Sequence, residues 1–364
     1  MSFSDFHGNL NTVDQLRRML ASCRFPHAVI IAGEEGSGKY KLAQMIAKSM
    51  NCLAPVTTNG LPDYCGNCAN CTRIAQADDL QQRFAEAVEA REGMREADKK
   101  DTRIFIQTHP YVLAIPPDPP QLLIKVGQVR RVIETIYFKP AESLRRVYIF
   151  TSSAFMKEAA NSILKILEEP PDFASIFLLT QNVGELLPTI RSRCIIFTLA
   201  ALPFAEIETL LANHRPQWNL RQRQLVARLS NGAVGRALSF DLDVYTAARK
   251  DALLMLQSSV NSQGHSELLR ATETYRAGAE GKEKTDQLIR SLYSLLEDLL
   301  IIKSAGVSLA RNTDILPELE RMAGSLSFDF IAQASDRLGR VESGMRRNLL
   351  RSLSLDAFAT SLEG

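Results

Sequence analysis

The chain has 364 residues, of which 45% are hydrophobic and 23% are charged, and its formal net charge is +2 at pH 7. This length and composition are typical of a globular protein with two or three domains, and they exclude an intrinsically disordered chain. The net charge is too small to indicate nucleic-acid binding by itself, because such binding needs many clustered lysines and arginines, so any contact with DNA is expected to be local or shared with partners.

No stretch of the sequence has the roughly 18 uninterrupted apolar residues that a membrane span needs. Residues 1–16 lack the basic and apolar regions of a secretion signal. We therefore expect a cytoplasmic protein with no membrane partner. Thiols are kept reduced in that compartment, so disulfides are not expected among the six cysteines.

The first predicted elements are a strand and a helix on either side of a glycine-rich segment. Residues 27–33 (HAVIIAG) are short and apolar, which predicts a buried strand, and residues 41–50 (KLAQMIAKSM) place apolar side chains at helical spacing. The segment between them reads GEEGSGKY, and this setting is that of a loop whose backbone N–H groups cradle nucleotide phosphates. The residues assigned to this nucleotide site are Gly33, Gly36, Gly38 and Lys39.

Tyr40 departs from this motif. Phosphate-binding loops place Ser or Thr directly after the lysine, because a small hydroxyl there ligates the Mg²⁺ that bridges the phosphates. A tyrosine is expected to crowd the metal position while its ring packs nearby. Nucleotide binding at this loop is therefore expected to be weak or purely structural.

Four cysteines follow the helix at a spacing typical of a metal site. They fall within twenty residues in the pattern C-x12-C-x2-C-x2-C, which suits a structural zinc with all four positions filled by protein. The alternative is a loop with four reduced cysteines. A redox-active pair is disfavoured, because no basic residue in DYCGNCANC lowers a thiol pKa. The predicted ligands are Cys52, Cys65, Cys68 and Cys71.

Residues 76–101 are polar, highly charged and free of proline, which predicts a solvated helix or helical hairpin. Opposite charges at helical spacing support this prediction, as in Glu92 and Glu96 with Arg95 and Lys99. A surface insertion is the preferred interpretation of this segment, and a binding role is the alternative.

Strands and helices continue to alternate up to about residue 200, which predicts an α/β fold. Beyond that point the strand patterns fade and only helical patterns remain, so the rest of the chain is predicted to be all-α. The predicted elements are a strand and proline-rich loop at 111–121, a helix at 124–138, a strand at 145–150, a helix at 157–171 stopped by Pro170 and Pro171, and a strand at 175–181.

The strand predicted at 145–150 ends in Thr151, Ser152 and Ser153. In P-loop ATPases this strand ends in acidic residues that hold Mg²⁺ and activate the attacking water. Serine and threonine carry no negative charge, and serine is a poor base at neutral pH. Two supports for Mg²⁺ and the water-activating acid are therefore missing together, which predicts a site that does not hydrolyse ATP.

The order of these motifs, with NSILKILEEPP, FLLTQNVGELLPTIRSRC and NGAVGRALS, resembles the bacterial clamp-loader group of AAA+ proteins over residues 3 to about 240. The resemblance implies an AAA+-like α/β P-loop core at 1–200, with a parallel sheet and a zinc module at 52–71. It also implies a small helical lid at 201–245 and an all-α collar at 246–364 that joins a five-membered ring. The implied partners are the gamma or tau and delta subunits and, through the assembled complex, the sliding clamp and primed DNA.

The resemblance also implies roles for two arginines. Arg193 in PTIRSRC matches the arginine that the family places at the subunit boundary, where it reaches the triphosphate bound by a neighbouring subunit. The alternative for Arg193 is an ordinary surface arginine. Arg236 in NGAVGRAL resembles the lid arginine that senses nucleotide, and here we expect it to hold the lid against the core.

Together these features predict a clamp-loader subunit of the bacterial DNA polymerase III complex that is not itself an enzyme. It would act as a stator and lend Arg193 in trans to the ATP site of its neighbour. Two alternatives stay open: an active ATPase motor subunit similar to tau or gamma, and a zinc-bearing adaptor that uses a P-loop fold for protein contacts outside replication.

Overall fold

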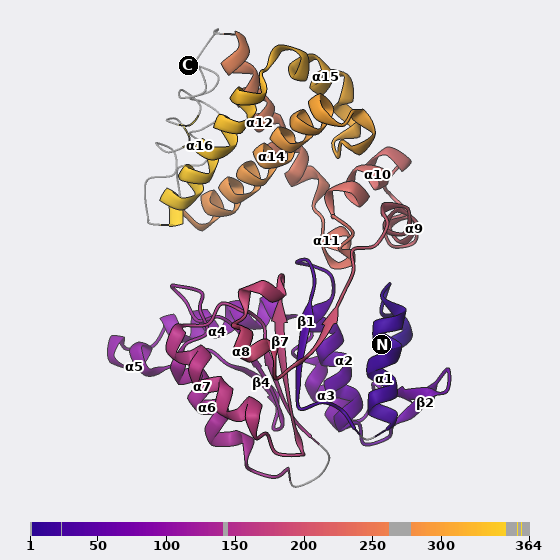
Figure 1. Ribbon diagram of the computed structural model, residues 1–364, viewed down its shortest axis with the longest axis vertical. Coiled ribbons are helices and arrows are strands. Elements are labelled where there is room, and N and C mark those ends of the chain that lie inside the picture. The colour runs from indigo at the N-terminus through magenta and orange to yellow at the C-terminus, as the bar shows by residue number, and fades with distance from the viewer. Residues whose placement is uncertain are drawn as a thin grey trace. The chain divides into compact units, whose positions relative to one another are not determined.

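The structure is a computed structural model that describes residues 2–22, 24–140, 145–261, 278–346, 355 and 358. The chain divides into two compact units (Figure 1). The first unit contains Met1–Pro203 and Gly232–Arg236, and the second contains Phe204–Asn231 and Ala237–Gly364. Parts of the predicted collar, among them residues 262–277 and 347–354, lie outside the described residues.

A six-stranded sheet forms the centre of the first unit. Its order is β4-β5-β6-β7-β1-β8, and all neighbours are parallel except the edge pair β4 and β5. In the register of β1 and β7, Ile30 lies opposite Leu178. The strands are β1 (Ala28–Ala32), β4 (Ile106–His109), β5 (Val112–Ile115), β6 (Arg146–Phe150), β7 (Ala174–Thr180) and β8 (Ile195–Thr198). Because parallel strands end at one edge of the sheet, the loops after β1, β6 and β7 meet there.

Helices cover both faces of this sheet (Figure 1). Side chains alternate along each strand, so Ile31 of β1 faces one helical layer while Ile30 faces the other. The first layer contains α1 (Leu10–Ala21), α2 (Lys39–Asn51) and α3 (Ala69–Ala75), and the second contains α6 (Val126–Ile136), α7 (Lys157–Glu168) and α8 (Pro188–Arg191). Both β1 and β7 are buried along their whole length, which explains why β1 is apolar throughout and β7 is mostly apolar.

The predicted elements of the core are confirmed, and the helix at 157–171 ends at Glu168, before Pro170. The charged insertion is helical, as predicted, and forms two helices, of which the first is capped by the Asp79 side chain as it accepts from the Gln82 N–H. Lys99 and Glu96 pair at 2.7 Å. The insertion helices are α4 (Leu80–Glu92) and α5 (Glu96–Asp101).

Four strands were not predicted. The edge strands β4 and β8 have four residues each, and the antiparallel hairpin of β2 (Val56–Thr58) and β3 (Leu61–Asp63) has three residues per strand. Such short segments hold too few residues to show an alternating pattern. The first unit also contains two short 3-10 helices, η1 (Phe3–Asp5) and η2 (Val183–Glu185).

The second unit is helical. Its core lies between α12, α14, α15 and α16, with Leu292, Leu295 and Leu299 of α14 fully buried. The described residues after Pro203 contain no strand, so the all-α prediction is confirmed for that part of the chain. The elements after Pro203 are α9 (Phe204–His214), α10 (Leu220–Leu229), α11 (Val234–Leu238), α12 (Leu242–Asn261), α14 (Gly278–Ser304), η3 (Val307–Leu309), η4 (Thr313–Ile315), α15 (Leu316–Ser325) and α16 (Phe328–Arg346). The first three residues of α11 belong to the first unit.

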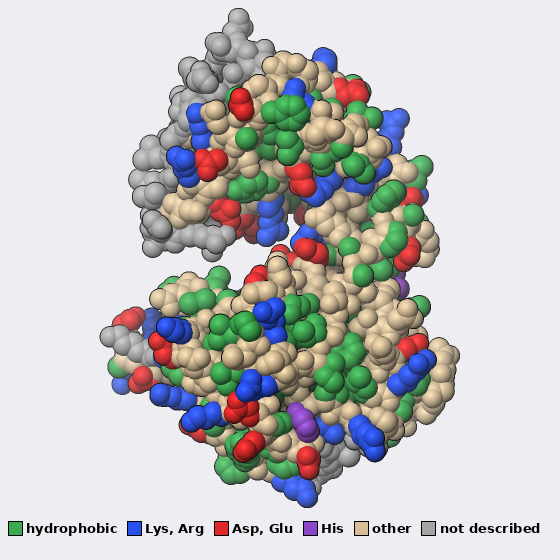
Figure 2. Space-filling view, in the orientation of Figure 1, with side chains coloured by type: hydrophobic (Ala, Val, Ile, Leu, Met, Phe, Trp, Pro, Cys, Tyr) green, Lys and Arg blue, Asp and Glu red, His purple; other side chains and the backbone are tan. Residues whose placement is uncertain are grey.

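Basic and acidic side chains are interspersed on the visible face of each unit (Figure 2). This mixture agrees with the small net charge of +2. Within the described part of the chain, no helix combines the length and apolar character of a membrane span.

Candidate functional site

The glycine-rich loop joins β1 to α2, as predicted. Gly36 and Gly38 have φ angles of 81° and 93°, in the left-handed region that favours glycine. The Gly36 carbonyl accepts a hydrogen bond from the Gly235 N–H at 2.7 Å. A Cβ atom at Gly36 would lie only 2.7 Å from the backbone nitrogen of Arg236. Glycine is therefore required here both by the turn and by the close approach of residues 232–236.

Lys39 folds back onto its own loop. Its Nζ donates to the carbonyls of Gly33 and Glu34 at 2.6 and 2.8 Å. Burial lowers the pKa of Lys39, while the charges of Glu35 and Glu34 act against this shift. A phosphate that enters the loop would therefore compete with two backbone carbonyls for this ammonium.

Tyr40 turns its hydroxyl into a buried hydrogen-bond network. The hydroxyl donates to the Ala77 carbonyl at 2.8 Å and accepts from Gln44 Nε2 at 2.5 Å. The ring packs against the core of the first helical layer and against Ile106 and Ala114. Burial also raises the pKa of Tyr40, so the hydroxyl stays protonated. Both hydrogen-bonding roles of this oxygen are used within the protein, which leaves it poorly suited to bind a cation.

A carboxylate that was not predicted lies where β6 and β7 end. One oxygen of Glu185, in η2, accepts from Ser153 Oγ at 2.5 Å and from Thr180 Oγ1 at 2.9 Å. Glu185 also acts electrostatically on Lys39. The P-loop motif predicts acidic residues at the end of β6 itself. Glu185 instead follows β7 in the sequence and reaches the end of β6 only in the folded chain. Its carboxylate joins the two strand ends.

Arg236 lies beside the glycine-rich loop. Its Nη2 is 4.0 Å from Glu35 Oε2, and the side chains of Arg236 and Glu35 are 30% and 64% exposed. An ion pair this long and this exposed contributes little to stability. The folded chain therefore brings Arg236 and the loop together mainly through the backbone contact between Gly235 and Gly36.

Arg193 lies in the turn between α8 and β8, with its side chain 33% exposed. Its Nη2 lies 2.5 Å from Glu168 Oε1, at the end of α7. Its Nη1 donates to the Thr189 carbonyl at 2.9 Å and to Ser192 Oγ at 3.3 Å. The guanidinium is thus held at the surface by one charged acceptor and two neutral acceptors.

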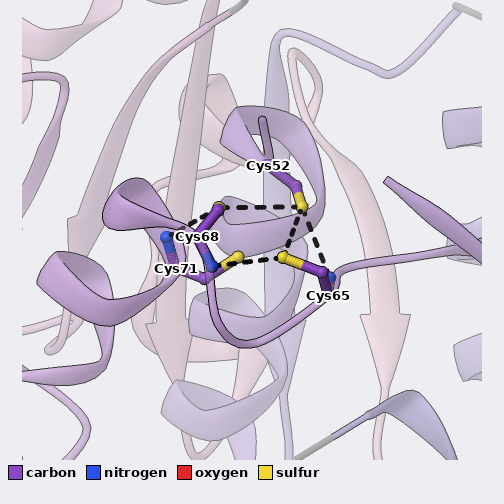
Figure 3. Close-up of side chains that lie close together, drawn as sticks. All are labelled: Cys52, Cys65, Cys68 and Cys71. Atoms are coloured by element: carbon purple, nitrogen blue, oxygen red, sulfur yellow. Dashed lines mark hydrogen bonds between the residues drawn. The ribbon is translucent and has the colours of Figure 1, made fainter. Parts of the chain in front are cut away.

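The four predicted cysteines come together in one cluster (Figure 3). Their Sγ atoms all lie within 4.8 Å of one another, and Cys52 Sγ is 3.5 Å from Cys65 Sγ and 3.9 Å from Cys68 Sγ. Four sulfurs around one zinc would be about 3.8 Å apart, given the Zn–S bond of roughly 2.3 Å. Cys52 caps the end of α2, Cys65 follows β3, and Cys68 and Cys71 lie at the start of α3.

The thiols of this cluster differ in acidity. Burial raises the pKa of Cys52 and Cys71. Burial acts in the same direction on Cys68, but the N–H groups of Cys71 and Leu53 and the neighbouring thiols outweigh it and lower the pKa of Cys68 to about 6. A bound cation would favour the thiolate form of all four cysteines. The cluster could therefore hold a metal ion such as zinc.

Comparison with known proteins gives a family and several relatives. Residues 8–203 match the family model described as "DNA polymerase III, delta subunit". The chain is 28% identical over 243 residues to DNA polymerase III subunit tau of Escherichia coli (strain K12), covering 65% of this chain and 32% of that protein. It is 26% identical over 246 residues to DNA polymerase III subunit delta' of Bacillus subtilis (strain 168), covering 66% of this chain and 62% of that protein. The chain thus spans less than two thirds of these relatives.

A solved structure of a DNA polymerase III gamma subunit-related protein from Thermotoga maritima aligns with 97% of this chain and 98% of its own chain. The TM-score of that alignment is 0.40 and the sequence identity is 18%.

Proposed function

The chain belongs to the DNA polymerase III delta subunit family, and from this membership we propose that it is a clamp-loader subunit of the delta-prime type. In this proposal it joins gamma or tau and delta subunits in the ring that loads the sliding clamp at primed DNA. It serves as a stator and does not hydrolyse ATP. Residues 201–245 act as the lid and residues 246–364 as the collar.

The chemistry around the glycine-rich loop carries this proposal. Hydrolysis needs ligands that hold Mg²⁺ between the phosphates and a group that activates water. The hydroxyl of Tyr40 is engaged by Ala77 and Gln44, and β6 ends without an acid. Glu185 lies at the ends of β6 and β7, but one of its oxygens already accepts hydrogen bonds from two hydroxyls. These residues support a site that has lost hydrolysis.

The position of Arg193 supports a role in trans. The guanidinium is partly exposed, and the next strand, β8, is the last in the order of the described sheet. Ile195 and Ile196 on this strand are 46% and 42% exposed, on opposite faces of the sheet, and a neighbouring subunit could cover this edge. A guanidinium suits a neighbour's triphosphate, because its charge is permanent and its planar donors match phosphate oxygens. We propose that Arg193 acts there as an arginine finger.

The cysteine cluster supports a structural zinc as the cofactor. All four ligand positions would be filled by Cys52, Cys65, Cys68 and Cys71, which leaves no open position for catalysis. The ion would join the end of α2 to the β2–β3 hairpin and to α3, and so fix the fold of the inserted segment.

An active motor subunit is the second candidate, because the Escherichia coli relative is a tau subunit. An ATPase assay separates the two candidates. The purified chain alone is expected to hydrolyse ATP no faster than its Lys39→Ala variant, because both lack the ligands for Mg²⁺. Turnover by the unmodified chain clearly above that of the variant would favour the motor.

A further inference from the structure

Glu168 is the last residue of α7, and its carboxylate lies 2.5 Å from Arg193 Nη2. The two residues are 25 positions apart in the sequence. A carboxylate at the carboxyl end of a helix is disfavoured by the helix dipole. The favourable partner for Glu168 is therefore the Arg193 guanidinium rather than its own helix.

The three hydrogen-bond acceptors of Arg193 differ in charge and in the part they play. The Thr189 carbonyl and Ser192 Oγ are neutral, belong to the same turn, and orient Nη1. Glu168 adds the negative charge. If that charge were removed, the two neutral acceptors would still hold the guanidinium in place, but its positive charge would no longer be compensated.

A phosphate approaching Arg193 meets a guanidinium that already has an anionic partner. It must displace the Glu168 carboxylate or bind beside it, and two anions on one guanidinium repel each other. The side chains of Arg193 and Glu168 are 33% and 51% exposed, so water screens the pair and its release is easy. The carboxylate weakens the approach of the phosphate without preventing it.

We propose that Glu168 is a positioning residue that competes with the nucleotide of the neighbouring subunit for Arg193, and so restrains ATP turnover until the subunits are closely packed. This inference rests on the proposed role of Arg193 in trans. Glu168 touches no nucleotide in this scheme and acts only through Arg193.

The test uses the chain reconstituted with its gamma or tau and delta subunits. Glu168→Gln keeps the size of the side chain and removes its charge. It is expected to raise kcat/KM for ATP about two- to fivefold at low ionic strength, which is the range that an exposed ion pair is worth. The gain should shrink as salt rises toward about 1 M, where the Debye length falls to roughly 3 Å.

Two controls separate this effect from a general change of charge or structure. Glu169→Gln removes the same charge one position further on, from an exposed side chain. It should leave turnover unchanged. The double variant Glu168→Gln with Arg193→Ala should behave like Arg193→Ala alone, because Glu168 has no effect without the guanidinium.

The outcomes distinguish the inference from the proposed function. Suppose that Arg193→Ala slows turnover, so that the role in trans stands. The proposed competition by Glu168 is then contradicted if turnover by Glu168→Gln equals that of the unmodified complex, falls below it, or rises no more than turnover by Glu169→Gln. A gain that persists in the double variant also overturns the competition. If Arg193→Ala leaves turnover unchanged, the role in trans fails, and the inference fails with it.

Discussion

The hydroxyl of Tyr40 donates a hydrogen bond to the backbone carbonyl of Ala77, 2.8 Å away and 37 positions further along the chain. The residue that breaks the phosphate-loop motif therefore links the start of α2 to the segment that follows α3. Its ring and its hydroxyl both serve the packing of the core.

Tyr40→Phe is expected to lower the free energy of unfolding by about 1–3 kcal/mol, because the Ala77 carbonyl and the buried Gln44 amide lose their partner. Urea denaturation measures this change. Tyr137→Phe is the matched control, since Tyr137 is 56% exposed and its variant should stay within about 0.5 kcal/mol of the unmodified chain. Equal stability of the two variants would contradict a structural role for the Tyr40 hydroxyl.

Tyr40→Thr restores the hydroxyl that the motif expects but removes the packed ring. Deleting a fully buried large side chain usually costs roughly 3–5 kcal/mol, and because Tyr40 is only partly buried we expect a loss near or below the lower end of this range. ATP hydrolysis should not appear, because β6 still ends in Thr151, Ser152 and Ser153. A steady-state assay checks this expectation. Turnover gained from this one substitution would show that the strand end does not limit the site.

Arg193→Ala is expected to leave assembly intact and to slow ATP turnover by the reconstituted complex. An arginine supplied from a neighbour can raise the rate of hydrolysis by about 10³ to 10⁵, so the neighbouring ATP site that the proposal pairs with Arg193 should lose nearly all of its hydrolysis. Size-exclusion chromatography and steady-state kinetics measure the two effects. Arg193→Lys keeps the charge without the planar fork of donors and should recover only part of the rate. Unchanged turnover in Arg193→Ala would remove this residue from the mechanism.

Metal analysis should find about one zinc per chain, the stoichiometry of a four-thiolate site. Replacing Cys65 and Cys68 by Ser should abolish binding, because two ligands are lost. Cys194→Ser is the control, since Cys194 lies outside the cluster. Carefully prepared protein without bound metal would count against the site.

The pKa values of the four cysteine thiols allow a second test of the metal site. Burial raises the pKa of Cys52 and Cys71, so both are protonated at pH 7 in the metal-free chain, whereas Cys68 with a pKa of about 6 is mostly a thiolate. Zinc binding at pH 7 should release at least two protons, and affinity should fall as pH falls. Calorimetry in buffers of different ionisation enthalpy counts the protons. Release of no protons would be incompatible with thiolate ligation.

Asp118 is fully buried, with Arg91 Nη1 at 2.5 Å and Lys125 Nζ at 3.1 Å. Asp118→Ala should lower the free energy of unfolding by about 3–5 kcal/mol, because it leaves two mostly buried cations without their counter-ion. Urea denaturation measures the loss. Glu86→Ala, which removes an exposed partner of Arg83, should change stability by less than about 1 kcal/mol. A similar small loss for Asp118→Ala would mean that water already compensates the charges of Arg91 and Lys125.

Much of the core could be predicted from the sequence, because its signals are local. The apolar strand at 27–33, the glycine-rich loop and the helix after it are contiguous, and the cysteine spacing requires no knowledge of distant residues. The helical character of the insertion was likewise predicted from its charge pattern. These features depend on backbone periodicity and on the geometry of short turns.

Contacts between distant segments could not be predicted. Arg91 belongs to an insertion that was interpreted as solvated, yet its guanidinium reaches a buried carboxylate 27 positions away. Glu185 contacts the end of β6 only because β6 and β7 are neighbours in the sheet. Charge composition reports how polar a segment is, and not which of its side chains the fold will bury.

The Gly235 N–H donates to the Gly36 carbonyl, so hydrogen exchange of this amide reports whether residues 232–236 stay in contact with the glycine-rich loop. That proton can exchange with solvent only when residues 232–236 separate from the glycine-rich loop. If the loop holds no nucleotide firmly, deuterium uptake at Gly235 should be the same with and without ATP. In a chain that closes around nucleotide, the same amide would become slower to label.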